Sequence, residues 1–196
     1  MAKTTISRVG YGQVEPNHLS AQRNGQIYAQ LPADDAIDLL ENGQFVKYDY
    51  ENGKVDFTGE GEWMMVFNEV KLYDDARETY KDFALERKNC TPGTYPDTSN
   101  QSVPVEHGVS TAGQMVPRVI RTSVGDIYTT NCLGAAGAKD VAYEGIDVEV
   151  GDKLTPSNTG YLNVADDAAN ADLVFTVVKV YTMPDGQPGV KLQRTK

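Results

Sequence analysis

The sequence predicts a mainly β protein with minor α content: an α+β N-terminal part with an extended arm, followed by a small antiparallel β-barrel or sandwich. Two observations predict this class. The 196-residue chain contains 18 Gly, 9 Pro and 11 Tyr, a composition that suits short strands joined by tight turns. Short apolar segments also recur at strand spacing through the second half. Hydrophobic residues make up 40% of the chain, which is enough to form a core.

The first 43 residues predict an arm and then a short helix. Residues 1–30 are polar with little periodicity, so we expect an extended arm, of a kind that orders when it is laid on a neighbouring subunit. A helix is predicted over 31–43, because Asp34 can cap its N-terminus and Gly43 can end it. Its apolar face would be formed by Ala36, Ile37 and Leu40.

The next segment predicts a hairpin, a buried strand and a second helix. Phe45 to Phe57 predicts a β-hairpin, because Asn52-Gly53 tolerates the backbone angles of a tight turn. The apolar run from Trp63 to Phe67 predicts a strand that is buried on both faces. A helix is predicted over 73–87, although its aromatic residues would also suit a strand. Its apolar face would consist of Ala76, Tyr80, Phe83 and Ala84.

Residues 89–114 are rich in Thr, Pro, Gly, Ser and Asn and mark the best domain boundary. We therefore divide the chain into an arm (1–30), an α+β part (31–100) and a β-barrel domain (101–196). Strands are predicted at 115–122, 126–130, 141–150, 153–154, 161–164, 173–181 and 190–193. Within this domain Val124–Thr129 and Val150–Thr155 both begin Val-Gly-Asp, which predicts a shared local turn.

The charge of the chain excludes several classes of partner. The net charge is −10 and the pI is near 4.6, with no basic run. Because nucleic-acid binding needs Lys and Arg to neutralise phosphates, we expect no nucleic-acid partner. Anionic lipid surfaces would be repelled, and no apolar stretch approaches the ~20 residues of a membrane span. The first residues lack a signal-peptide core, so synthesis in a cytoplasm is expected.

Few residues in the sequence are candidates for catalysis or for binding a metal or phosphate. His18 and His107 lie in polar segments typical of surface loops. Cys90 and Cys132 are far apart and are expected to be free, buried thiols in a reducing compartment. Neither the histidines nor the cysteines match the pattern of a hydrolase, in which the nucleophile is activated by an adjacent base. Leu133–Asp140 is rich in glycine but lacks the Gly-Lys-Ser/Thr end of a phosphate-binding loop.

The acidic residues could in principle form a glycosidase site or a calcium site, but the sequence supports neither assignment. Glycoside hydrolysis needs two carboxylates that flank one bond, but the neighbours in a doublet point in different directions, so the doublets predict capping or solvated loops. The doublets are Asp34-Asp35, Asp74-Asp75 and Asp166-Asp167. A calcium site at Asp147, Glu149 and Asp152 would lack the EF-hand pattern. We therefore assign no catalytic, cofactor-binding or metal-binding residue and expect a non-enzymatic protein without a cofactor.

Four stretches of the C-terminal half carry a family resemblance: Val150–Thr155, Thr159–Leu162, Val174–Tyr181 and Val190–Leu192. Together they resemble the head-decoration (cement) proteins and related virion proteins of tailed bacteriophages. The resemblance implies a structural protein at the capsid surface, made in the host cytoplasm. Its partner would be the major capsid protein lattice, and self-association, for instance as a trimer, is expected.

Under this hypothesis the N-terminal part docks on the lattice, and the β-barrel projects from it or seals a subunit junction. Two alternatives stay open. The first is a head fibre, neck or tail structural protein, in which exposed aromatic rings would stack on carbohydrate. The second is a small hydrolase that uses the acidic pairs.

Overall fold

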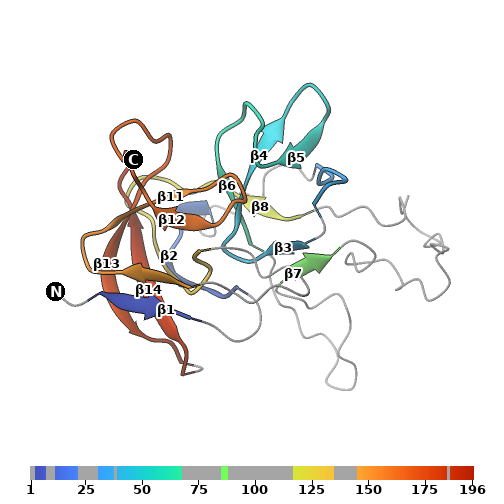
Figure 1. The fold of residues 1–196 in the computed structure, drawn as a ribbon. Coiled ribbons are helices and arrows are strands. Elements are labelled where there is room, and N and C mark those ends of the chain that lie inside the picture. The colour runs from blue at the N-terminus through green and yellow to red at the C-terminus, as the bar shows by residue number, and fades with distance from the viewer. Residues whose placement is uncertain are drawn as a thin grey trace, which may run out of the picture.

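The computed structural model describes residues 3–7, 12–21, 31–37, 39–67, 85–87, 117–134, 145–184 and 186–196. The predicted mainly β class is confirmed, because strands dominate these residues and pair in antiparallel ladders (Figure 1). The predicted barrel is not formed as a closed structure within the described part of the chain. The principal sheet is open, with β12 and β2 at its edges.

This principal sheet has six strands. In spatial order they are β12 (Leu162–Val164), β11 (Lys153–Pro156), β13 (Phe175–Thr182), β14 (Pro188–Arg194), β9 (Ile127–Thr130) and β2 (Val14–His18). The strands predicted in the C-terminal part at these positions are therefore confirmed. A parallel bridge between Leu133 and Leu162 also brings the chain beyond β9 back to β12. The sheet is thus curled on itself without closing.

A second sheet has four strands: β5 (Lys54–Asp56), β4 (Phe45–Asp49), β6 (Met64–Val66) and β8 (Val119–Ile120). The predicted hairpin is confirmed by the pairing of β4 with β5, with Gly53 at a φ of 63° in the connection. The positive φ explains why glycine occupies this position.

Two short strand pairs complete the fold. β1 (Thr4–Ile6) pairs with β10 (Ile146–Val148), and β3 (Leu39–Glu41) pairs with β7 (Leu85–Arg87). Both strands of the predicted arm, β1 and β2, are extended, and both pair with strands from the C-terminal part of the chain. The buried side chains of Ile6, Leu19 and Ala21 join the core of the principal sheet.

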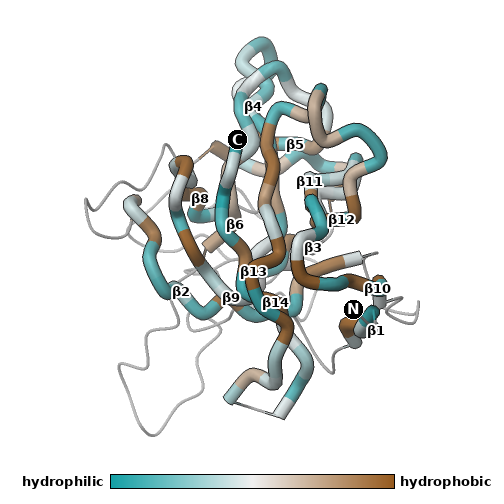
Figure 2. Tube along the Cα trace, turned by 90° about the vertical axis from the view of Figure 1, so that its left-hand side faces the viewer, coloured by the Kyte–Doolittle hydropathy of each residue, from teal (hydrophilic) through white to brown (hydrophobic). Residues whose placement is uncertain are grey.

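Two apolar clusters lie on the two faces of the four-stranded sheet. Met65 and Ile120 pack into the larger cluster under the principal sheet, whereas Met64, Val66 and Val119 pack into the smaller one. Because neighbouring residues of a strand point to opposite faces, a strand between two cores must be apolar throughout. The prediction that Trp63–Phe67 contains a strand buried on both faces is therefore confirmed for β6. The hydropathy view shows apolar stretches running through β13 and β14 (Figure 2).

The helix predicted over 31–43 is wrong. Pro32 and Asp34 use their backbone groups to bond Val55 of β5, and Leu40 lies in the strand β3. Asp34 does cap a turn, since its carboxylate accepts the N–H of Ala36 at 2.9 Å, but the turn does not continue into a helix. Of the helix predicted over 73–87, only 85–87 are described, and they form β7 instead.

No helix in the described part of the chain combines the length and apolarity needed to cross a membrane.

Candidate functional site

The two Val-Gly-Asp segments form the same turn. In each, the Asp carboxylate accepts the N–H of the residue three positions earlier: Ser123 to Asp126 at 2.8 Å and Glu149 to Asp152 at 2.9 Å. The Asp N–H returns a bond to the carbonyl of that residue, at 2.9 and 3.2 Å respectively. The predicted shared turn is confirmed, and its sequence signal is the short Asp side chain that bonds the nearby backbone.

Each glycine of this motif joins its turn to a neighbouring strand. Gly125 has a φ of 96° and donates to Arg194, while Gly151 has a φ of 100° and donates to Val177. Positive φ values of this size favour glycine. The N–H of Arg194 and that of Val177 then bond back to the Asp carbonyl of the same turn, each at 2.9 Å.

The two turns belong to a larger internal symmetry. At the centre of the principal sheet, Thr176 of β13 pairs with Gln193 of β14. One strand outward, Thr176 pairs with Lys153 of β11, and Gln193 pairs with Ile127 of β9. β12 then pairs with β11 as β2 pairs with β9. An approximate two-fold axis through the Thr176–Gln193 pair therefore relates the two halves of the sheet, although β2 comes from the start of the chain.

Asp126 also fixes the arm. Its side chain is buried, and its carboxylate accepts the N–H and the hydroxyl of Ser20 at 3.0 and 2.9 Å. The nearby guanidinium of Arg194 bonds the carbonyl of Thr122. Burial lowers the pKa of Arg194. A buried carboxylate bonded to several backbone amides serves to hold segments together.

Glu41 is a second buried carboxylate, with 2% of its surface exposed. It accepts the N–H of Gly12 at 3.1 Å and the hydroxyl of Tyr161. The backbone N–H of Glu41 donates to the side-chain oxygen of Gln44. The side-chain nitrogen of Gln44 in turn donates to the carbonyl of Thr159 at 2.7 Å. Glu41 therefore joins the arm, the β3–β4 turn and the segment before β12.

The outer face of the principal sheet carries three lysines, two of which lie beside one tyrosine. We call this surface the lysine face and define it by Lys153, Lys179, Lys191, Tyr181 and Glu15. Lys179 pairs directly with Lys191 across β13 and β14, so their side chains share a face. Lys153 and Lys179 are exposed, and Lys191 is half-buried. Figure 2 shows β13, β14, β9 and β2 lying side by side.

Tyr181 contacts two lysines of the lysine face. The ammonium groups of Lys179 and Lys191 lie 5.4 and 5.9 Å from the centre of its ring, within cation–π range. Its hydroxyl donates to Glu15 at 3.0 Å and contacts Thr129 at 2.7 Å. Partial burial raises the pKa of Tyr181, so the hydroxyl is protonated at neutral pH.

A β-bulge places these side chains on the outer face. The register between β13 and β14 shifts between Val177 and Lys179, so Val178 is the extra residue. Without the shift, alternation would turn Lys179 inward and Val180 outward. With it, Lys179 and Tyr181 point outward, and Val180 packs against the apolar core.

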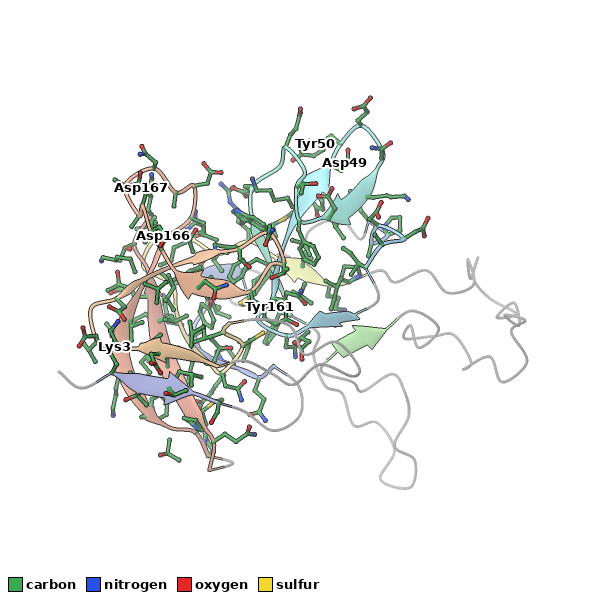
Figure 3. The ribbon with its side chains drawn as sticks, viewed as in Figure 1. Lys3, Asp49, Tyr50, Tyr161, Asp166 and Asp167 are labelled. Atoms are coloured by element: carbon green, nitrogen blue, oxygen red, sulfur yellow. The ribbon has the colours of Figure 1, made fainter. Side chains whose placement is uncertain are left out.

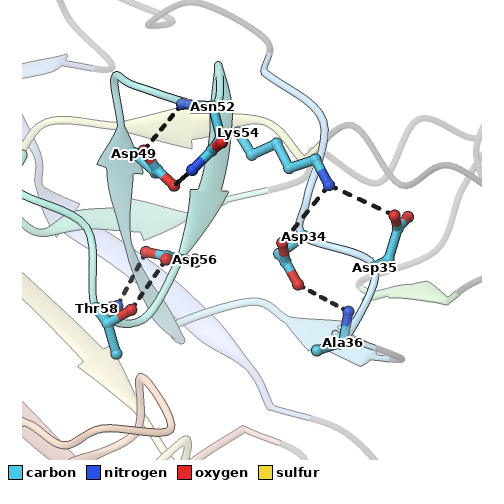
Figure 4. A network of polar contacts seen from close by, with 8 residues as sticks. All are labelled: Asp34, Asp35, Ala36, Asp49, Asn52, Lys54, Asp56 and Thr58. Atoms are coloured by element: carbon cyan, nitrogen blue, oxygen red, sulfur yellow. Dashed lines mark hydrogen bonds and ion pairs between the residues drawn. The ribbon is translucent and has the colours of Figure 1, made fainter.

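Both described acidic doublets lie in turns, which agrees with the loop predicted for Asp166-Asp167 but not with the helix start predicted for Asp34-Asp35. Lys54 bridges Asp34 and Asp35 at 3.6 and 3.4 Å (Figure 4). In the β4–β5 connection, the carboxylate of Asp49 accepts both the backbone and side-chain N–H groups of Asn52. These bonds lower the pKa of Asp49.

Asp166-Asp167 lies in an exposed turn near one end of the molecule (Figure 3). The carboxylate of Asp167 accepts the side chain of Asn170 at 2.6 Å, and this bond lowers its pKa. The doublet Asp74-Asp75 lies outside the described residues. Among the described residues, no hydrogen bond or ion pair joins Asp34-Asp35 to Asp166-Asp167.

The other candidate residues are dispersed. His18 is exposed at the end of β2, and Cys132 is buried and in no disulfide, as predicted. Asp147 accepts the hydroxyl of Thr5 in the β1–β10 pair. Within the described ranges no three Asp, Glu, His or Cys side chains are grouped as metal ligands. His107, Cys90 and most of the glycine-rich segment 133–140 lie outside the described residues.

The lysine face is absent from the predictions made from sequence. A signal for it exists in the alternation Lys179-Val180-Tyr181 and Lys191-Leu192-Gln193, which places one polar and one apolar face on each strand. The position of the bulge and the strand partners were needed to place the lysines opposite each other.

A scan against protein-family models, a search of curated proteins and a search of solved structures each return no match for this chain.

Proposed function

We propose that this chain is a non-enzymatic structural protein of a tailed-phage virion, which binds the major capsid protein lattice as a decoration or stabilising protein. The observation that carries the proposal is the Val-Gly-Asp turn followed by its strand. The first of the four stretches that carry the resemblance to decoration proteins is this motif at Val150–Thr155, and here the Val-Gly-Asp turn occurs twice with matching hydrogen bonds. A repeated rigid turn suits a protein whose task is to present a fixed surface.

The use of the buried carboxylates supports the same proposal. Asp126 and Glu41 bond the backbone of the arm, at Ser20 and Gly12 respectively. A carboxylate that works as an acid or base must reach a substrate, whereas these two are buried and bonded to the chain itself. Their role is to fix the arm on the body and so keep the surface in one shape.

The test is binding to capsids of a tailed phage that encodes the chain. Purified protein is mixed with expanded capsids and with unexpanded precursors, and the pellets are analysed after sedimentation. We expect saturable binding to expanded capsids, and the chain should be detected in purified virions by mass spectrometry. Absence from both the pellet and the virion would overturn the proposal.

A head fibre, neck or tail protein is the second candidate. The observation that favours it is Tyr50, which is 68% exposed beside Tyr48 at the end of a hairpin, with ring centres 5.8 Å apart (Figure 3). An exposed ring held by a second ring suits stacking on a sugar. Electron microscopy of virions labelled on this chain separates the two candidates, because the label lies over the head lattice in one case and at the neck or tail in the other.

A further inference from the structure

We propose that the lysine face is a docking surface for an acidic, carboxylate-bearing segment of a partner protein. The inference goes beyond a role in a virion, because it assigns a surface of this chain and the chemistry of what binds there. It holds whether or not the partner is a capsid protein.

The first step is an unfavourable arrangement of charge. Lys179 and Lys191 are direct cross-strand partners, and both ammonium groups converge on the ring of Tyr181. Like charges directly opposite each other destabilise a sheet. The carboxylate of Glu15, on this face, accepts a hydrogen bond from the hydroxyl of Tyr181 at 3.0 Å. No carboxylate among the described residues forms an ion pair with Lys153, Lys179 or Lys191. In contrast, Lys47, Lys54 and Arg121 each form an ion pair.

The second step is that the arrangement depends on a local irregularity. The bulge between Val177 and Lys179 turns Lys179 and Tyr181 outward. The adjoining ladder between β14 and β9 keeps an unbroken register, so the irregularity at Val178 is confined to the pairing of β13 with β14. Bulges that turn a side chain are features of functional surfaces more often than of plain sheets. An irregular register or an unfavourable pair of charges that does not stabilise the fold is expected at a binding site.

The third step identifies the occupant. The lysine face is a small cationic area on a chain whose net charge is −10. A long polyanion such as nucleic acid would extend beyond this area and be repelled by its surroundings. A short run of Asp or Glu side chains fits, because it meets the lysines without reaching further. Tyr181, already bonded to Glu15, keeps its ring in place between the ammonium groups.

The experiment measures binding of a fluorescein-labelled poly-glutamate peptide by fluorescence anisotropy at low and high salt. Poly-glutamine of the same length and an oligothymidine are the comparison probes. The variant Lys179→Gln/Lys191→Gln removes the paired lysines. Lys3→Gln/Lys196→Gln is the matched control, because it removes the same charge from exposed positions outside the lysine face. Circular dichroism establishes that both variants are folded.

We expect poly-glutamate to bind the wild type in a salt-sensitive manner, with about tenfold weaker binding to Lys179→Gln/Lys191→Gln, since truncating interface charges lowers affinity and its salt dependence. The control variant should keep wild-type affinity, and the ring resonances of Tyr181 should shift on binding. Equal weakening of both variants, or no binding by the wild type, would overturn the proposal. Tighter binding of oligothymidine through the same lysines would assign the face to nucleic acid instead, and lysine-dependent self-association in light scattering would assign it to a second copy.

Discussion

The hydroxyl of Tyr161, a residue labelled in Figure 3, donates a hydrogen bond to the buried carboxylate of Glu41, across 120 positions of sequence. Tyr161 is 1% exposed and Glu41 is 2% exposed, so water does not compete for the bond. The contact joins the strand β3 to the segment that leads into β12. It therefore couples the smaller core, which contains Leu40, to the principal sheet.

Removing this hydroxyl is predicted to destabilise the fold. Tyr161→Phe leaves a buried carboxylate oxygen without that donor, and the expected loss in free energy of unfolding is about 1–3 kcal/mol. Tyr128→Phe is the matched control. Tyr128 is equally buried, but its hydroxyl has no partner among the described residues. Burial raises its pKa well above the usual value, so removing the neutral hydroxyl should cost nothing or stabilise the protein. Urea unfolding of both variants tests the contrast, and equal losses would contradict it.

The two Val-Gly-Asp turns allow a second matched comparison. Asp126→Ala and Asp152→Ala each remove a carboxylate that accepts a backbone N–H within the turn. Asp126 also bonds Ser20 of the arm and is 2% exposed, whereas Asp152 is only half-buried. We expect Asp152→Ala to cost about 1 kcal/mol and Asp126→Ala about 2–3 kcal/mol, because the latter leaves several buried donors unpaired. Thermal and urea unfolding measure the difference, and a larger loss at Asp152 would refute the comparison.

Gly12 is predicted to tolerate no side chain. A Cβ at this position would lie 2.6 Å from the carbonyl oxygen of Asn42 and 2.7 Å from the sulfur of Cys132. Gly12→Ala should therefore destabilise the protein by about 1–3 kcal/mol through overpacking. The weakening should be greatest at the arm, and hydrogen exchange of the β2 amides should accelerate. Gly53→Ala is the comparison, since a Cβ there meets nothing within 4 Å. Its positive φ of 63° strains an alanine, but the strain lies in the β4–β5 turn and should not accelerate exchange at β2 selectively.

Asp49 is predicted to titrate below its ordinary value of 3.8, because its carboxylate accepts hydrogen bonds from Asn52. A depressed folded-state pKa adds stability above the unfolded value, and this contribution is lost as the pH falls through the folded value. Carbon NMR of the carboxyl group measures the titration directly. In Asn52→Ala the pKa should rise towards 3.8, whereas the pKa of Asp167, which depends on Asn170, should stay low. An unchanged pKa of Asp49 in that variant would contradict the assigned cause.

The sequence alone is sufficient for the strands whose cause is local. β6 is predictable because an apolar run of strand length needs burial on both sides, and the Val-Gly-Asp turns are predictable because Asp bonds its own neighbourhood. The structure of the segment 31–43 is not predictable in this way. Asp34 is a residue type that caps helices, but its N–H bonds the carbonyl of Val55 at 2.9 Å instead. That competing partner is set by the tertiary fold. The lysine face likewise depends on a bulge at Val178 that alternation cannot locate.

The repulsion between Lys179 and Lys191 leads to the last prediction. Lys191→Gln removes one of two like charges that face each other across the sheet, and it loses only the longer of the two contacts with Tyr181, at 5.9 Å. We expect the free energy of unfolding to rise by about 0.5 kcal/mol. The gain should shrink at high salt, because screening weakens the repulsion in the wild type. Lys3→Gln lowers the same charge at an exposed position and should give no gain. A loss of stability in Lys191→Gln at low salt would mean that the cation–π contact outweighs the repulsion, and the unfavourable charge arrangement that motivates a docking role for this face would no longer stand.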